Sequence, residues 1–404
     1  MGALSHIRVL DLSRVLAGPW STQILGDLGA EIVKIEKPGE GDETRAFGPP
    51  FLNGTEGTKG DAAYFLSANR NKKSAAIDFS KPDGAELVRR LARRSHVVVE
   101  NFRTGTLARY GLDAASLSRE NPALIYCSLT GFGHDGPYKD KAGYDYLIQG
   151  MGGLMSITGQ PDGTPGAEPM KVGVAVSDIF TGLYATIAIL AAIVHQARTG
   201  EGQTIDMALF DCQAAALANQ AMNYLAGETV PARMGNAHPN IVPYQVFATS
   251  DGHIILAVAN DRQFRNFCRA AGLDELAGDA AYASNEGRVH HRATLIGLLA
   301  PVLAARSTHD WINLLEAANV PCGPINRIDE VFSDPQAIAR GLAISMQHAT
   351  GTIDLVASPL RLSKTPPEYR LSPPLLGQHT TEILHDALNL RDEDIAALQK
   401  RGVI

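Results

Sequence analysis

Residues 7–36, IRVLDLSRVLAGPWSTQILGDLGAEIVKIE, decide the fold class of this chain. Two strand-like runs, at 7–12 and 31–36, flank a helical pattern of apolar residues over 18–29. Neighbouring parallel strands need a crossover connection, and this helical segment has the length to supply one. The stretch therefore predicts a unit of two parallel strands joined by a helix.

The same alternation continues along the chain and extends the sheet. Further strand-like runs occupy residues 75–79, 96–101 and 124–129. A helical pattern lies between the first two of these runs, at residues 81–94. We therefore predict an α/β fold, with a large domain built on a Rossmann-like parallel sheet at 1–205 and completed by 329–404. A linker helix at 206–225 and a polar Gly/Pro segment lead to a smaller α+β domain, expected at 226–328.

The composition is that of an ordinary folded protein. Of the 404 residues, 45% are hydrophobic and 20% charged, and 36 basic against 43 acidic residues give a net charge of −7. This mildly acidic balance gives no general footprint for nucleic acid or for an anionic membrane. Any anionic ligand must then be held by local cationic groups.

Cysteine spacing and apolar runs bear on location. Cys127, Cys212, Cys268 and Cys322 lie far apart without a CxxC pair, so we expect neither a zinc site nor disulfides. The N-terminus shows no targeting segment, and the longest apolar stretch, 179–194, falls short of the roughly 20 residues that span a bilayer. We expect a buried core helix there, no membrane partner and a reducing, cytoplasmic location.

The usual nucleotide and hydrolase motifs are absent where they would act: the sequence has no GxxxxGK[ST], GxSxG or HExxH, and the turn after the first strand, SRVLAGPW, is not GxGxxG. Cationic residues instead gather in four places near predicted strand ends: Lys37, the run 69–73 (NRNKK), Arg103 with Arg109, and Lys139 with Lys141. Each place alone is an ordinary solvated surface charge. Together on one rim of an α/β sheet, they would bind a phosphorylated ligand.

Asp178 opens the long apolar helical run VAVSDIFTGLYATIAILAAIV, and two interpretations stay open. As a cap or first-turn carboxylate, it would accept hydrogen bonds from the free backbone N–H groups. Alternatively, the helix N-terminus would keep a partly buried carboxylate ionised, as a carboxylate nucleophile must be. Both interpretations are compatible with one another.

Motifs spread along nearly the whole chain resemble those of the class III CoA-transferases. They are RVLAGP (14–19), GDLGAEIVKIEKPGEGDETR (26–45), NRNKKS (69–74), VENFRTG (99–105), TGFGHDGP (130–137), GYDYL (143–147), SDIFTGLYA (177–185), VPCGPIN (320–326) and PPLLGQHT (373–380). Within the family, GPPF (48–51), AHPNIVPYQVF (237–247) and SNEGRVHHR (284–292) look most like the succinyl-CoA:glutarate branch.

The resemblance implies an activity, a mechanism and an assembly. Asp178 would attack the thioester of succinyl-CoA or a similar donor to give a mixed anhydride, and CoA thiolate would return to form an aspartyl-CoA thioester. A dicarboxylic acceptor such as glutarate would then repeat these steps in reverse. CoA would be a substrate, no permanently bound cofactor or metal is expected, and the chain would form an interlocked homodimer.

The resemblance also implies site residues, carried over position by position. Contacts to CoA are expected from Leu16, Ala17, Lys37, Asn71, Lys72, Lys73, Asn101, Phe102, Arg103, Arg109, Lys141, Tyr144 and Asp145. The second carboxylate of a dicarboxylic acceptor needs a cationic or hydrogen-bonding partner, since a buried unpaired charge is costly. The candidates are Arg45, His238, Tyr244 and Arg288, for each of which ordinary salt bridging or packing is the alternative.

Two departures from the family pattern leave other activities open. The segment 226–244 contains only Gly227 and Gly235, where formyl-CoA transferase has a glycine-rich loop, which weakens a formyl or oxalate assignment. Racemases of the same fold carry His in a GHD segment, where this chain has Tyr144, which weakens the 2-methylacyl-CoA racemase alternative. Malate, itaconate, oxalate and carnitine remain alternative acceptors, and a CoA-binding protein without catalysis is the non-enzymatic alternative.

Overall fold

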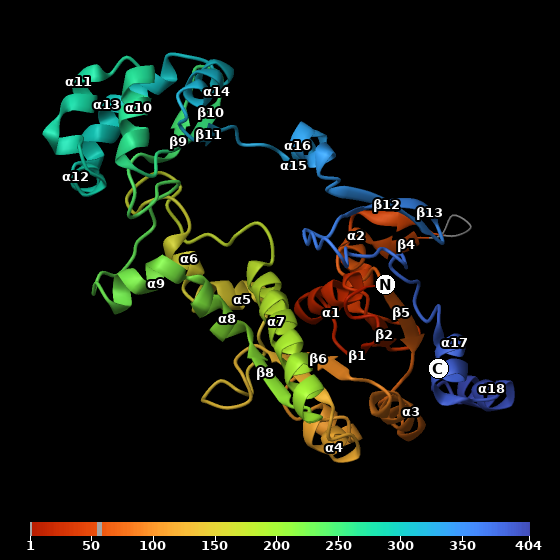
Figure 1. The fold of residues 1–404 in the computed structure, drawn as a ribbon. Helices are drawn as coiled ribbons and strands as arrows, with labels where there is room; N and C mark the ends of the chain where they lie inside the picture. Colours follow the sequence, from red (N-terminus) through yellow and green to blue (C-terminus); the bar gives the residue numbers. More distant parts are fainter. Residues whose placement is uncertain (1, 55–58) are drawn as a thin grey trace. The chain divides into compact units, whose positions relative to one another are not determined.

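The computed structural model describes residues 2–54 and 59–404, which fall into two compact units (Figure 1). The larger unit comprises residues 1–154, 171–229 and 336–404, and the smaller comprises 155–170 and 230–335. These bounds differ from the expected ones at three places. Residues 155–170 and 329–335 belong to the smaller unit, whereas residues 206–229, which include the helices of the expected linker, belong to the larger one.

The larger unit is built on one six-stranded parallel sheet. Its strands are β1 (Arg8–Asp11), β2 (Glu31–Glu36), β5 (Lys72–Ala76), β6 (Val97–Glu100), β7 (Ile125–Thr130) and β8 (Thr204–Ala208). They lie in the order β5-β2-β1-β6-β7-β8, and every neighbouring pair is parallel. This confirms the predicted Rossmann-like sheet, and it places the reversal of strand order between β1 and β6, where such sheets bind ligands.

Alternate residues of each strand enter two separate cores, as the period of two in a strand requires. On one face, Val9, Val97 and Ile125 pack with α1 (Ala17–Asp27) and α7 (Val176–Thr199). The core on the other face holds Leu10, Val98 and Tyr126 together with residues of further helices: α3 (Pro82–Arg93), α4 (Ala114–Glu120), α17 (Thr380–Leu388) and α18 (Asp392–Lys400). Both faces of the sheet are therefore covered, which explains the continuous apolar runs of β6 and β7.

The sequence predicts a buried core helix at α7, but only one face of this helix is buried. Thr181, Ala185 and Ile189 face the core, whereas an opposite stripe of large apolar side chains is exposed, namely Leu183, Tyr184, Ile187 and Val194. By length and composition alone, α7 is the one helix of the described residues that could cross a membrane. Its packing on α1, β7 and β8 instead makes it a core helix of the sheet domain with one uncovered face.

Shorter elements surround the carboxyl edge of the sheet or extend the larger unit. They are η1 (Glu43–Ala46), β3 (Phe51–Asn53), β4 (Lys59–Ala62), α2 (Ala63–Leu66), η3 (Leu107–Tyr110), α5 (Asp145–Met151), α8 (Leu209–Ala216), α9 (Ala218–Leu225), β12 (Ala343–His348) and β13 (Gly351–Val356). Strands β12 and β13 form an antiparallel hairpin whose apolar residues pack on Phe65 and Leu66 of α2. The C-terminal segment thereby completes the larger unit.

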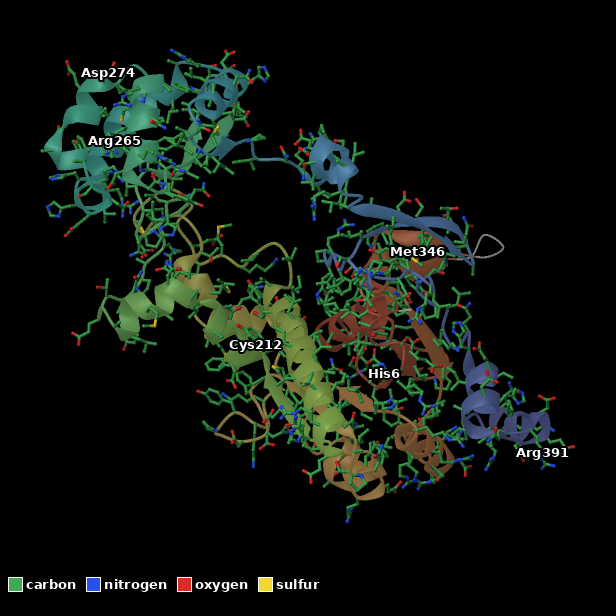
Figure 2. The ribbon with its side chains drawn as sticks, viewed as in Figure 1. His6, Cys212, Arg265, Asp274, Met346 and Arg391 are labelled. Carbon is green, nitrogen blue, oxygen red and sulfur yellow. The ribbon has the colours of Figure 1, made fainter. Side chains whose placement is uncertain are left out.

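The smaller unit has its own α+β core. Its three-stranded antiparallel sheet runs β11 (Cys322–Gly323), β10 (His253–Ala257), β9 (Tyr244–Ala248). The accompanying helices include α10 (Asp261–Ala270), α11 (Asp274–Gly278), η4 (Ala280–Tyr282), α12 (Asn285–His290), α13 (Arg292–Ala304) and α14 (Thr308–Ala317). The fully buried rings of Phe264, Phe267 and Trp311 lie in the core between this sheet and its helices. Figure 2 shows the side chains of the described residues on this framework.

Candidate active site

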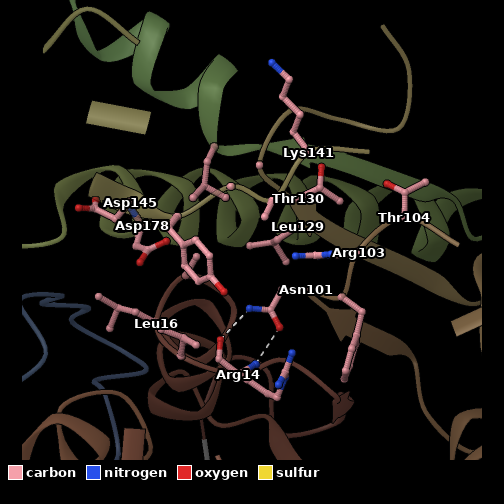
Figure 3. Close-up of a pocket in the computed structure, with 18 of the residues that line it drawn as sticks. Arg14, Leu16, Asn101, Arg103, Thr104, Leu129, Thr130, Lys141, Asp145 and Asp178 are labelled. Carbon is pink, nitrogen blue, oxygen red and sulfur yellow. Dashed lines mark hydrogen bonds between the residues drawn. The ribbon is translucent and has the colours of Figure 1, made fainter. Parts of the chain in front are cut away.

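A cavity opens at the carboxyl ends of β1, β6, β7 and β8, where the strand order reverses (Figure 3). Nine of the predicted site residues line it: Leu16, Ala17, Asn101, Phe102, Arg103, Lys141, Tyr144, Asp145 and Asp178. They come from the loops after β1, β6 and β7 and from the first turns of α5 and α7. The structure therefore brings together residues that lie up to 162 positions apart in the sequence, Leu16 and Asp178 being the outermost.

A second cavity adjoins the first. Both are lined by Arg14, Glu43, Phe47 and Phe102, where the guanidinium of Arg14 pairs with Glu43 and lies 4.7 Å from the centroid of the Phe102 ring. Residues after β2 and β5 complete the second cavity, including Lys37 and the segment 77–80. The volumes of the two cavities are about 260 and 580 Å³.

The loop after β1 is held in an uncommon backbone conformation beside the first cavity. Val15 has a φ of 68°, in the left-handed region that β-branched residues rarely adopt. The side chain of Asn101 fixes the preceding residue by accepting a hydrogen bond from Arg14 N (2.8 Å) and donating one to Arg14 O (2.7 Å). Asp42 accepts another from Val15 N at 3.2 Å. Asn101, expected to contact CoA, thus pins the loop that carries Leu16.

Asp178 lies in the first turn of α7, and that helix packs closely on α1. A Cβ atom on Gly182 would lie 2.7 Å from the carbonyl oxygen of Ala17, closer than real side chains approach. Glycine at this position therefore lets α7 come within contact of the start of α1. This close approach sets Asp178 beside the loop of Leu16 and Ala17 in the cavity.

The N-terminus of α7 is capped by a side chain from another helix. Asp145, the first residue of α5, accepts hydrogen bonds through Oδ1 from the backbone N–H groups of Ser177 (2.8 Å) and Asp178 (3.3 Å). Its Oδ2 accepts a hydrogen bond from Gln149 Nε2 at 2.7 Å. The Asp178 carboxylate itself accepts no hydrogen bond from any of the residues that the structure describes. Asp178 is therefore a first-turn residue but not the cap.

The ionisation of Asp178 corrects the expectation that the helix N-terminus keeps this carboxylate charged. Burial raises the pKa of Asp178 to about 7, and the nearby negative charge of Asp145 raises it further in the same direction. The physical reason is that Asp145, rather than Asp178, receives the N–H groups of the helix end. Asp178 is then close to half ionised at neutral pH in the free protein.

The cationic run 69–73 lies elsewhere, which corrects three expected CoA contacts. β5 begins at Lys72 rather than at residue 75, so Lys72 and Lys73 are the first two residues of the strand and do not follow its carboxyl end. Lys72 is fully buried and donates to Asp11, the carbonyl of Pro19 and Asn69, which uses all three of its N–H bonds. Burial lowers the pKa of Lys72 to about 8.

Neighbours of Lys72 are also engaged in structural contacts. Lys73 pairs with Glu382 at 2.7 Å. The amide of Asn71 donates to Asp27 and to a backbone carbonyl and accepts two backbone N–H groups from residues 370 and 371. Arg109 lies exposed in η3 and lines neither cavity. Asn71 and Lys73 hold the C-terminal segment, and Arg109 lies away from both cavities. Fewer cationic residues therefore surround the cavities than the sequence predicts.

Two of the four acceptor candidates are bound within the fold. Arg45 is buried in a bidentate pair with Glu36 (2.7 and 2.9 Å) and also binds Asp61 at 2.6 Å. Arg288 has no exposed surface, and its guanidinium donates to two backbone carbonyls and to Asp261 at 2.9 Å. Ordinary salt bridging, the stated alternative, accounts for both arginines.

The other two candidates lie together in the smaller unit. The rings of His238 and Tyr244 have centroids 5.3 Å apart in an edge-to-face arrangement. Burial and the charge of Arg292 lower the pKa of His238, so the imidazole is neutral at neutral pH. Tyr244 is partly exposed.

Several cavity residues were missed by the sequence analysis. Arg14 and Glu43 stand inside quoted motifs, but nothing in the sequence shows that they form a pair between two cavities. Residues 77–80 line the second cavity and lie at the carboxyl end of a predicted strand. Ligands bind at such strand ends in α/β sheets, so this position is a signal that could have identified the segment. Tyr64 on α2 packs on Phe47, and its pKa is raised by burial and by the charge of Asp178. No sequence signal identifies Tyr64.

The chain also carries no evident metal cluster in the part that the structure describes. Among residues 2–54 and 59–404, no three His, Cys, Asp or Glu side chains gather in a group that would hold a metal ion. The four cysteines are free thiols, and burial raises the pKa of each.

Comparison with known proteins agrees with this geometry. The family model described as CoA-transferase family III matches residues 4–380. The chain is 52% identical over 382 residues to a succinate–glutarate CoA-transferase of Agrobacterium fabrum, with 94% of each chain covered. It is 44% identical over 402 residues to human succinyl-CoA:glutarate CoA-transferase, covering 99% of this chain and 90% of that protein.

A solved structure shares the fold. The crystal structure of a CaiB/BaiF family protein from Brucella suis matches with a TM-score of 0.84 at 49% identity, covering 96% of this chain and 99% of that one. The family match, the full-length relatives and the free aspartate in the cavity at the strand-order reversal agree. The chain belongs to CoA-transferase family III, and it is a class III CoA-transferase.

Proposed function

We propose that this enzyme moves CoA from succinyl-CoA to a dicarboxylic acid such as glutarate. The single observation that carries the proposal is the free, half-buried carboxylate of Asp178 in the cavity at the carboxyl ends of β1, β6 and β7. The substrate pair follows from the relatives, whose names specify succinate or succinyl-CoA together with glutarate.

In the proposed reaction, a carboxylate oxygen of Asp178 attacks the thioester carbon of succinyl-CoA, and the C–S bond breaks. CoA leaves as a thiolate, and a succinyl-aspartyl anhydride remains. The thiolate then attacks the aspartyl carbonyl, which releases succinate and leaves CoA bound to Asp178 as a thioester. The acceptor carboxylate attacks this thioester, and the returning thiolate takes the acceptor acyl group and restores the Asp178 carboxylate.

The two adjoining cavities suit the length of CoA. We place the thioester in the cavity of Asp178, next to Leu16 and Ala17, and the nucleotide in the second cavity, next to Lys37. Phe102 lines both cavities and lies where the two parts of the ligand meet. Lys141 and Arg103 are exposed cations on the first cavity, available to anionic groups of either substrate.

For the second carboxylate of the acceptor, His238 and Tyr244 remain the proposed partners. Tyr244 has an exposed ring whose hydroxyl bonds none of the residues that the structure describes, and neutral His238 retains one N–H donor. Replacing the true partner, as in Tyr244→Phe or His238→Gln, should raise the KM for glutarate far more than that for a monocarboxylate. Equal effects on both acceptors would contradict this assignment.

The test of the reaction is mass spectrometry of acyl-CoA products after incubation with succinyl-CoA and a panel of glutarate, malate, itaconate, oxalate and carnitine. Glutaryl-CoA formation that is lost in Asp178→Ala and kept in Asp83→Asn would support the proposal. Asp83 is a matched control, because it is an exposed first-turn carboxylate of α3 paired with Arg401. Exchange of an α-proton in a branched acyl-CoA without acyl transfer would point to a racemase instead.

We also propose a homodimer in a cytoplasmic, reducing compartment. The exposed apolar stripe of α7 supports the first part, because monomeric proteins rarely leave Leu183, Tyr184 and Ile187 together in water. Four free thiols fit the second part. Light scattering should report a dimer for the native chain and a smaller species for Ile187→Glu. A monomeric native chain would contradict the proposal.

A further inference from the structure

The backbone donors at the start of α7 can be accounted for one by one. A helix begins with N–H groups that have no partner within the helix. Here Val176 N–H bonds the carbonyl of residue 174 (2.8 Å), and Ile179 N–H bonds that of residue 175 (3.1 Å). The two donors between them, on Ser177 and Asp178, both bond Asp145 Oδ1. All four are therefore satisfied without the Asp178 side chain.

The capping carboxylate is itself held by buried groups. Gln149, one turn further along α5 and fully buried, donates to Asp145 Oδ2 at 2.7 Å and accepts from the N–H of Val172 at 2.9 Å. Ser177, also fully buried, donates its hydroxyl to Gln213 of α8 at 2.7 Å. The start of α7 is thus held between α5 and α8 by side chains that form no hydrogen bond with the carboxylate of Asp178.

We infer that Asp145 is a positioning residue that caps α7 in place of Asp178, so that the nucleophile stays free and oriented in the cavity. A first-turn aspartate without such a competitor bonds the N–H groups of its own helix, which lowers its basicity and turns it away from a substrate. Asp145 takes those N–H groups and adds a negative charge beside Asp178. This inference rests on the proposal that Asp178 is the nucleophile.

Three variants separate the geometry of the cap from its charge. In Asp145→Ala, cap and charge are lost, so kcat should fall about tenfold or more while the KM values stay within about threefold, because a misplaced nucleophile slows chemistry rather than binding. In Asp145→Asn, the amide oxygen still accepts N–H groups, so most of kcat should return. Asp83→Asn is the matched control and should leave both constants unchanged, since Asp83 pairs with Arg401 away from both cavities.

The pH profile gives a readout that loss of structure alone would not move. Activity needs ionised Asp178, and the Asp145 charge opposes that ionisation. The acid limb of kcat/KM should therefore move to lower pH in Asp145→Asn. The other titratable or charged side chains on this cavity or coupled to it are Arg14, Glu43, Tyr64, Arg103, Lys139, Lys141 and Tyr144, and they are the same in both proteins.

Each outcome decides the question. A wild-type kcat and an unmoved acid limb in Asp145→Asn and Asp145→Ala would overturn the inference, and so would a raised KM with unchanged kcat, which would make Asp145 a substrate contact. Should Asp145→Ala fail to fold by circular dichroism, the pH profile of Asp145→Asn still decides. Activity in Asp178→Ala would overturn the nucleophile proposal itself, whereas an inactive Asp178→Ala with a wild-type Asp145→Ala would overturn only this inference.

Discussion

The raised pKa of Asp178 predicts that donor turnover falls off on the acid side of neutrality. With a pKa of about 7, the ionised fraction of Asp178 is about 0.9 at pH 8 and about 0.1 at pH 6. Since only the carboxylate attacks the thioester in the proposed reaction, kcat/KM for succinyl-CoA should drop about tenfold between these pH values. At its ordinary pKa near 3.8, Asp178 would be more than about 99% ionised at both, and the profile would be flat.

Initial rates at low succinyl-CoA, followed by chromatography of glutaryl-CoA between about pH 5.5 and pH 8.5, would measure this limb, because kcat/KM reports the free enzyme. CoA phosphate groups also titrate near pH 6, so binding of succinyl-CoA to Asp178→Asn must be measured over the same range. Dividing out that binding curve leaves the contribution of Asp178. A corrected profile that stays level down to pH 5.5 would refute the argument that burial and Asp145 hold this carboxyl partly protonated.

The remaining predictions concern buried charges. Lys72→Met should lower the free energy of unfolding in urea by about 3–5 kcal/mol, because Asp11 is left buried without its cation; a stable variant with a weakened CoA affinity would restore Lys72 as a ligand contact. Arg45→Met should also destabilise the fold, yet leave the ratio of KM values for glutarate and a monocarboxylate unchanged. Asp178→Asn should raise Tm at pH 8 but not at pH 4 by scanning calorimetry. An acid with a raised folded-state pKa costs stability increasingly as pH climbs from about 3.8 to about 7, and the amide removes that cost.

The sequence was sufficient to predict the parallel sheet and the position of Asp178 at the start of a long apolar helix, and the family resemblance added eight more residues that line the cavity. Hydrophobic runs report which segments are strands, and the carboxyl ends of parallel strands meet at one edge. Strand ends are reported less well. The apolar run at 75–79 predicts a strand that starts at residue 75, whereas β5 begins at Lys72. Lys72 was therefore expected in an exposed loop, although it is a buried strand residue.

Side-chain partners from distant segments were beyond sequence reasoning. Lys72 is neutralised by Asp11, 61 residues earlier, and Arg45 by Glu36 and Asp61 from two different segments. The motif residue Asn101 holds the backbone of Arg14, 87 residues away, although its position in a family motif suggested a ligand contact. A single sequence gives the type and spacing of such residues, but their bonding is fixed only when the strands align.

Asp145 caps helix α7, which leaves the carboxylate of Asp178 without backbone hydrogen bonds, and this arrangement suits the proposed reaction. A basic carboxylate is a better nucleophile toward the thioester than the acids it exchanges, which ionise near the ordinary value of a carboxyl group. Because its acid is weaker, less ionisation energy is released when its thioester is cleaved, so the aspartyl-CoA thioester lies lower than it would with an ordinary aspartate. In the proposed reaction, CoA is therefore retained on Asp178 while succinate leaves and the acceptor enters. A first-turn aspartate bonded to its own helix would have the opposite property, which is the physical reason for placing the cap on a different helix.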